Sequence, residues 1–345
     1  MTAQVRLSLG IKGKEGILRH YASVLRSKVA STSRAALSWA PILRAVPRPD
    51  RPQGLSAVVR VKDEETWLSV SMQSIATVAD EIIVADNGST DRTSEILSGL
   101  QQKFQDQLIV LRRPELDIRE LTNVLIERTR FRWVIGWDAD FVAQTDGPRS
   151  ISHFRKWLFD LDPRRYVCAY LNMTEVYGDL FHQRPETATR ADCHCFSYSD
   201  HLRYVYGWAG YEAPKVPRWY LVLRYEIPTF FHIDVKPVPR MFLSSLWKRY
   251  LTDPERGRYP SFEAYLETQL KEQWGRQSIE EVASTWAASA FRHLVPYDRE
   301  RFGDYPTLLK PFLDNPKYRL LYEDGKIVGQ QRLENPHAST VEADV

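Results

Sequence analysis

Apolar residues in the first half of the chain follow two alternating patterns. Four short runs rich in Val, Ile and Trp lack polar alternation, which is typical of strands buried on both faces. Between the runs, apolar residues recur at helical spacing. The pattern predicts parallel strands joined by right-handed helical crossovers. The predicted strands are 55–61, 81–85, 107–111 and 133–137, and the predicted helices are 64–78, 93–104 and 119–128.

The pattern is less regular after residue 148. The segment 174–216 is rich in aromatic and polar residues and has weak periodicity. We predict a helix at 150–161, strands at 166–172, 220–227 and 229–233, and at least two helices within 242–292. The expected organisation is a basic helical leader and linker (1–53), a catalytic domain (54–240), a helical C-terminal region (241–334) and a disordered tail (335–345). The expected fold class is α/β, a mostly parallel sheet flanked by helices with a helical C-terminal appendage.

Composition narrows the class of protein. The 345 residues are 43% hydrophobic and 26% charged, which is typical of globular proteins and not of disordered or fibrous ones. The net charge of +3 is too small to indicate a nucleic-acid partner. The three cysteines form no disulfide framework, no apolar stretch is long enough to span a bilayer, and the N-terminus lacks the apolar core of a secretory signal. We therefore expect a cytoplasmic protein.

The excess of basic over acidic residues is confined to the leader. Residues 1–51 contain ten Lys or Arg residues and only two acids, Glu15 and Asp50. Apolar residues at 17–29 recur at helical spacing, with basic residues on the other faces. A helix packed on its own catalytic domain is the simpler interpretation. The second interpretation is a peripheral contact with the anionic inner face of a membrane.

Charged residues follow the first and second predicted strands, where ligands of parallel sheets bind. Asp63 can cap the next helix, and Glu64 favours its N-terminus, but a cap does not explain Arg60 and Lys62. Two cations at a strand end suit an anionic ligand. After the second strand, Asn87 belongs to a turn signal. The acid before it, Asp86, is costly to bury without a partner, and a nucleobase or ribose is a natural one.

The fourth predicted strand ends in Asp138-Ala139-Asp140. Two carboxylates at this spacing can share one cation once the chain leaves the strand. A hard divalent ion prefers oxygen ligands and bridges to phosphate oxygens. This is the third acidic strand end in series, so the pattern predicts a metal and diphosphate site at one edge of the sheet.

The stretches 55–65, 81–93 and 133–140 together resemble family 2 of the glycosyltransferases, whose fold is the Rossmann-like GT-A fold. The resemblance implies a metal-dependent enzyme that uses Mn²⁺ or Mg²⁺ to move a sugar from a UDP- or GDP-sugar donor to a hydroxyl acceptor. It departs from many relatives at Asn87, where an Asp is common, and at Thr122-Asn123, where Arg-Asn is common. The nucleotide-sugar site that it implies comprises Arg60, Lys62, Asp63, Glu64, Asp86, Asn87, Arg119, Asp138, Ala139 and Lys236.

The resemblance extends less clearly to later residues. It makes Glu212 the candidate general base, with Asp200 and Glu175 as rivals and a plain surface glutamate as the alternative. It also makes His232 a metal ligand together with Asp140, and it lets Lys236 and Arg240 close on the diphosphate after the donor has bound.

Other functions remain as alternatives to transfer. One is a degenerate GT-A protein that only binds nucleotide-sugars. Another is a sugar nucleotidyltransferase, although 55–65 lacks the Gly-rich loop that such an enzyme needs. The sequence leaves open the donor base, the sugar, the acceptor, the stereochemistry and the oligomeric state.

Overall fold

The computed structural model describes residues 33–43, 45–46, 49–185, 189–206, 212–253, 255–275 and 278–333, without the side chains of 189–192. The predicted leader helix at 17–29 and the predicted tail at 335–345 lie outside the described residues. No described helix is both long enough and apolar enough to cross a membrane.

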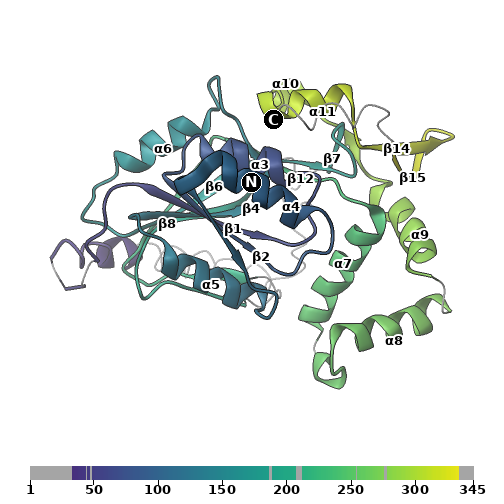
Figure 1. Ribbon diagram of the computed structural model, residues 1–345, viewed down its shortest axis with the longest axis horizontal. Coiled ribbons are helices and arrows are strands. Elements are labelled where there is room, and N and C mark those ends of the chain that lie inside the picture. The colour runs from purple at the N-terminus through teal and green to yellow at the C-terminus, as the bar shows by residue number, and fades with distance from the viewer. Residues whose placement is uncertain are drawn as a thin grey trace, which may run out of the picture.

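A large mixed sheet forms the centre of the molecule (Figure 1). Its strand order is β3-β2-β1-β4-β8-β6-β12-β5, with β11 also paired to β6. Strands β3, β2, β1 and β4 run parallel, whereas β8 is antiparallel to both of its neighbours and β5 is antiparallel to β12. The strands are β1 (Leu55–Val61), β2 (Glu81–Asp86), β3 (Leu108–Arg112), β4 (Trp133–Asp138), β5 (Phe141–Ala143), β6 (Val167–Tyr177), β8 (Thr189–Ser197), β11 (Leu221–Tyr225) and β12 (Phe230–Asp234).

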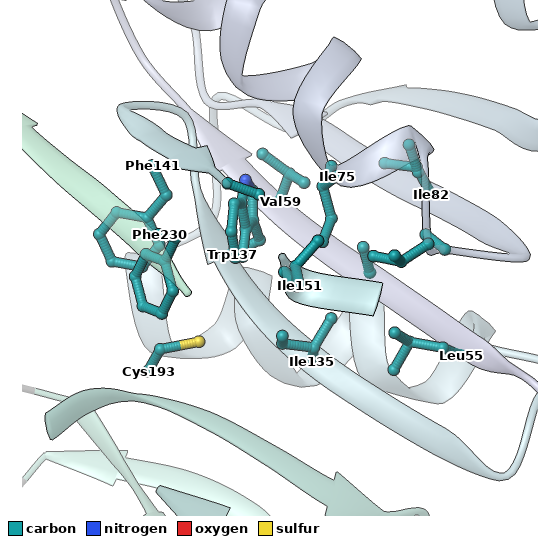
Figure 2. Packing of buried hydrophobic residues seen from close by; sticks show 14 of the residues in the cluster. Leu55, Val59, Ile75, Ile82, Ile135, Trp137, Phe141, Ile151, Cys193 and Phe230 are labelled. Carbon is teal, nitrogen blue, oxygen red and sulfur yellow. The ribbon is translucent and has the colours of Figure 1, made fainter. Parts of the chain in front are cut away.

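Helices cover both faces of the parallel half of the sheet, which explains the uninterrupted apolar runs. Leu55, Val59 and Trp137 point to one face, where they pack with Ile75 and Ile151 from two of the helices (Figure 2). The intervening side chains pack on the other face against the helix α5. The first face carries α3 (Leu68–Ala76), α4 (Thr93–Phe104) and α6 (Ile151–Phe159), and the second carries α5 (Ile118–Arg128). The predicted α/β class with flanking helices is confirmed.

The helix predicted at 64–78 begins later than expected. Asp63 adopts a positive φ of 53°, and α3 starts only at Leu68. Asp63 therefore does not cap this helix: its Oδ1 accepts a hydrogen bond of 2.6 Å from the backbone of Thr90. The residues between Asp63 and Leu68 form a turn that brings the buried Glu64 to the edge of the sheet.

The segment 174–216 contains strands that its weak periodicity did not predict. Strand β6 continues to Tyr177 and is almost entirely buried, so it shows no apolar alternation. Residues 189–197 form the strand β8 between β4 and β6. The remaining strands of the segment are β7 (His182–Gln183), β9 (Arg203–Tyr206) and β10 (Glu212–Lys215).

The C-terminal helices are present. Phe302 and Leu309 pack with Trp67 and Phe231 of the sheet domain, whereas the helices within 238–291 surround a core with Tyr177 and Leu294. They lie to one side of the sheet in Figure 1. The region is not wholly helical, because it ends in an antiparallel hairpin. Its elements are α7 (Val238–Thr252), α8 (Phe262–Trp274), α9 (Ile279–Phe291), β13 (Val295–Pro296), α10 (Arg299–Phe302), α11 (Lys310–Asp314), β14 (Tyr318–Glu323) and β15 (Lys326–Arg332), and short 3₁₀ turns occur at Gln105–Gln107, Arg256–Arg258 and Thr307–Leu309.

Candidate active site

Strand register brings the predicted acidic strand ends to one edge of the sheet. Arg60 in β1 lies opposite Asp138 in β4, and the next residue, Val61, lies opposite Asp86 in β2. Strand β12 runs parallel to the end of β6 and antiparallel to β5. The backbone of Ile233 in β12 donates a 2.9 Å hydrogen bond to the carbonyl of Asp140. Strands far apart in the sequence therefore bring Asp140 next to His232.

Four charged side chains meet at this point, and we call Glu64, Asp140, His232 and Lys236 the Asp140 cluster. The Lys236 ammonium lies 2.6 Å from Asp140 Oδ2 and 3.5 Å from Glu64 Oε2. His232 Nε2 lies 3.5 Å from the same Asp140 oxygen. Both carboxylates are buried, with side-chain exposures of 7% for Asp140 and 5% for Glu64.

The cations determine the ionisation of the Asp140 cluster. Burial alone would raise the pKa of Asp140, but Lys236 and His232 hold that pKa well below its usual range. Burial would likewise lower the pKa of His232, yet Asp140 and Glu175 raise it to about 10. Burial, reinforced by the charge of Asp140, raises the pKa of Glu64 despite the opposing effect of Lys236. At neutral pH and without a bound ion, Asp140 is therefore ionised and His232 is protonated.

Glu175 lies beside the second ring nitrogen of His232 at the distance of an ion pair, without a well-aligned hydrogen bond. Its Oε1 lies 3.4 Å from His232 Nδ1, and its Oε2 accepts a 3.0 Å hydrogen bond from Arg184. The Glu175 side chain is 1% exposed. These contacts favour a supporting role for Glu175 over its alternative role as a base. The sequence provided no signal for Arg184, which follows the short strand β7 in a segment of weak periodicity.

Arg60 is neutralised by two carboxylates from other strands. Its Nη2 lies 2.8 Å from Asp138 Oδ1, its Nη1 is hydrogen-bonded to Glu212, and the same Nη1 lies 3.3 Å from Thr122 Oγ1. Burial opposes the charge of Arg60, but Asp138 and Glu212 outweigh it and raise the pKa of the guanidinium. The structure thus brings Asp138 and Glu212 to one side chain, and the predicted contact of Arg60 with a nucleotide stays a prediction.

Asp86 and Asn87 have partners within the protein. Asp86 accepts hydrogen bonds of 2.8 Å from the backbone of Ser89 and 2.6 Å from Ser94 Oγ. Burial would raise the pKa of Asp86, but these hydrogen bonds, with the Ser94 bond the stronger influence, lower it. The Asn87 amide donates to the carbonyls of Arg113 and Leu116. Burial of Asp86 therefore requires no nucleoside, and its nucleoside contact stays a prediction.

The other predicted site residues differ in exposure. Lys62 is exposed, and Ala139 is buried. The Arg119 side chain is 37% exposed, and it contacts Asp117 and Glu120 at 3.2 Å. Their contacts with a nucleotide stay predictions.

Asp200, a rival of Glu212 as the base, lies at the other edge of the sheet. It follows β8, whose last residue, Ser197, lies opposite Trp133 at the beginning of β4. Asp138 ends the same strand. Because the strand separates them, Asp200 is remote from the predicted metal site.

Arg240 and Trp67 join the site from elements outside the strand ends. Arg240 donates to Glu64 Oε2 at 2.8 Å and to the backbone carbonyls of Lys62 and Asp63. The Trp67 indole donates a 2.7 Å hydrogen bond to the carbonyl of Val235. These contacts connect the turn after β1 to the chain after β12. They fix the backbone that carries Lys236.

The described residues contain no group of three or more His, Cys, Asp or Glu side chains arranged to hold a metal ion. Asp140 and His232 do meet as a pair, at a distance that one ion could bridge. The three cysteines, Cys168, Cys193 and Cys195, are free and buried.

Comparison with protein families identifies the part of the chain that forms this edge. Residues 56–151, from β1 to the beginning of α6, match the model of glycosyl transferase family 2. This segment is a family 2 glycosyltransferase domain. The predicted family and the predicted class of enzyme, a glycosyltransferase, are confirmed by this segment.

The glycosyltransferase also resembles solved structures of low identity. The S. aureus TarS fragment 1-349 is 16% identical, covers 82% of this chain and 97% of its own, and gives a TM-score of 0.36. The same fragment in complex with UDP-GlcNAc is 14% identical, with the same coverage and a TM-score of 0.36. Mannosyltransferase PcManGT from Pyrobaculum calidifontis, in complex with GDP-Man and Mn²⁺, is 14% identical. The match covers 77% of this chain and 86% of the mannosyltransferase, and its TM-score is 0.34. No curated protein matches the sequence at a significant level.

Proposed function

We propose that the glycosyltransferase moves a sugar from a UDP- or GDP-sugar to a hydroxyl acceptor with the help of Mn²⁺ or Mg²⁺. The observation that carries the proposal is the Asp140 cluster. It places an ionised, buried carboxylate 3.5 Å from the ring of His232 at the carboxyl edge of the parallel strands. Ligands of such sheets bind at that edge.

The residues of the Asp140 cluster fit a hard divalent ion. Mg²⁺ is usually held by one or two carboxylates, with substrate phosphates and water completing its coordination, and Mn²⁺ prefers the same oxygen ligands. Asp140 and His232 would therefore suffice as protein ligands, with the Nε2 proton of His232 released to solvent when the ion binds. Glu175 lies 3.4 Å from the other nitrogen of His232, the place where acids commonly support metal-binding histidines. When bound, the ion would neutralise the diphosphate as a leaving group.

The remaining site residues divide between donor and acceptor. We assign the nucleoside to Asp63, Asp86, Asn87 and the first strand end, and the diphosphate to Lys236 and Arg119. Glu212 would take the proton of the attacking hydroxyl if configuration is inverted. Arg60 holds Glu212 beside Asp138 through hydrogen bonds to both. A retaining reaction would not require this base, and Glu212 would then lose its role.

The domain limits are part of the proposal. The fold of the described residues supports a catalytic domain at 54–240, because the large sheet lies within that range. The helices within 238–291 pack around a cluster that also contains Tyr177 of β6, and Phe302 and Leu309 pack with Phe231 of the sheet, so the boundary at residue 241 follows the end of the sheet and not a break between cores. A cytoplasmic location and a peripheral membrane contact of the basic leader stay predictions, and so does the ability to form oligomers.

A thermal-shift panel tests the proposed function. Purified protein is heated with UDP, GDP, ADP or CMP, each with and without Mn²⁺. We expect the melting temperature to rise only with UDP or GDP, by about 5 °C at a hundredfold excess over the dissociation constant, and only when Mn²⁺ is present.

Each nucleotide without Mn²⁺, and Mn²⁺ without nucleotide, serve as controls. Equal shifts with and without the ion would contradict metal dependence. No shift with any nucleoside diphosphate would contradict the donor class. A donor that binds but is never consumed with any acceptor would favour the alternative of a nucleotide-sugar-binding protein.

A further inference from the structure

Lys236 occupies a position that is unusual for a phosphate-binding lysine. Its ammonium lies between two buried carboxylates, 2.6 Å from Asp140 and 3.5 Å from Glu64, and its side chain is only 19% exposed. The Asp140 oxygen that it contacts is also the oxygen that faces His232. Lys236 thus forms an ion pair with the same Asp140 oxygen that would ligate the proposed metal.

Glu64 has one carboxylate oxygen that finds no hydrogen-bond partner among the described residues. Its Oε2 faces Lys236 and Arg240, but its Oε1 is buried and has no hydrogen-bond partner. A buried carboxylate oxygen without a partner is costly, and proteins rarely retain one unless it serves a ligand. Glu64 Oε1 can therefore still accept from a further cation or donor.

We propose that Lys236 is an internal counter-cation that holds Asp140 until the donor diphosphate draws it away, so that nucleotide and divalent metal bind cooperatively. The inference rests on the proposed function, because it requires both ligands to share this edge of the sheet. It assigns to Lys236 a role in the order of binding in addition to a contact with phosphate.

Electrostatic repulsion gives the physical reason. A metal ion on Asp140 would lie beside the Lys236 ammonium, and like charges at such short range in a buried site repel strongly. A diphosphate offers the ammonium new charged acceptors, and charge-assisted hydrogen bonds to phosphate are strong. The backbone on either side of Lys236 can remain in place, because Trp67 holds Val235 and α7 begins two residues later. Only the side chain has to move.

Such coupling is reciprocal and can be measured from the metal side. If nucleotide raises the affinity for Mn²⁺ by a given factor, Mn²⁺ raises the affinity for nucleotide by the same factor. Removing the charge of Lys236 should therefore tighten Mn²⁺ binding in the absence of nucleotide. It should also reduce the further gain that nucleotide produces.

The experiment measures free Mn²⁺ by its electron paramagnetic resonance signal during titration of the full chain. Lys236→Met removes the charge and keeps the length of the side chain, whereas Lys236→Gln also keeps a hydrogen-bond donor for Asp140. Lys215→Met is the matched control, because Lys215 is exposed on β10. Circular dichroism melts confirm that each variant is folded. Titrations are made without nucleotide and with UDP or GDP, after correction for Mn²⁺ bound by the nucleotide alone.

We expect Lys236→Met and Lys236→Gln to bind Mn²⁺ without nucleotide about tenfold more tightly than the wild type and Lys215→Met. We expect nucleotide to tighten Mn²⁺ binding at least about tenfold in the wild type, and clearly less in the Lys236 variants. Folded Lys236 variants whose nucleotide-free affinity equals that of the wild type would overturn the proposal. If neither nucleotide binds the wild type but the variants still gain Mn²⁺ affinity, the donor assignment fails while the counter-cation stands.

Discussion

Replacement of Asp140 by asparagine is expected to lower sugar transfer about a thousandfold and to abolish the Mn²⁺-dependent thermal shift. The substitution keeps the shape of the side chain and removes the charge that attracts the ion. Stabilisation of a leaving group by a metal is worth several kcal/mol, and each 1.36 kcal/mol is a factor of ten in rate. Release of nucleoside diphosphate from the donor found in the thermal-shift panel measures the loss.

The variant also removes the shared partner of Lys236 and His232, so its stability must be measured separately. A melting curve without ligands shows whether the chain is folded at the assay temperature. Asp314→Asn, at the exposed last residue of α11, is the matched control and should behave as the wild type. A folded Asp140→Asn enzyme that keeps its Mn²⁺-dependent turnover would show that the metal is held elsewhere.

Replacement of Glu212 by glutamine is expected to lower the turnover number about a hundredfold to ten-thousandfold, the range that general bases contribute. Glutamine keeps an oxygen that can accept the hydrogen bond from Arg60, so the geometry of the site should be preserved. Binding of UDP or GDP with Mn²⁺ should change little, because the base acts on the acceptor. The measurement is the turnover number together with the nucleotide affinity from thermal shifts.

Glu267→Gln, exposed on α8, is the control for loss of a carboxylate. If Glu212→Gln weakens nucleotide binding as much as turnover, Glu212 supports donor binding through its contact with Arg60 and Asp138 and does not act as the base. If neither quantity changes, the enzyme either uses another base or retains configuration.

The parallel half of the fold could be predicted closely from the sequence. Strand β1 and helix α4 have the bounds that their apolar patterns predicted. Each pattern is set by which of the element's own side chains are buried, and the sequence shows this directly. The late start of α3 could not be predicted, because Asp63 is held by Thr90 from another turn. Strand β8 was missed for a similar reason, since its pairing with β4 and β6 depends on residues distant in the sequence.

The same distinction holds for the site. The meeting of Asp138, Arg60 and Asp86 at one edge follows from parallel register, which strand order predicts. The register does not predict which side chains the charged residues of the site pair with. Arg60 finds Glu212 at a separation of 152 positions, and Asp140 finds Lys236 at 96. Such pairings depend on tertiary packing, so the sequence predicted which residues gather but not that their charges are already balanced.

The central claim is that Asp140 and His232 hold a divalent ion where the sheet binds a diphosphate. Crystals soaked with Mn²⁺ and either UDP or GDP test it most directly, through the anomalous scattering of manganese. The account predicts one strong anomalous peak in contact with the Asp140 carboxylate and His232, adjacent to density for the diphosphate. Diphosphate density at this edge without manganese at Asp140, or manganese bound away from both residues, would contradict it.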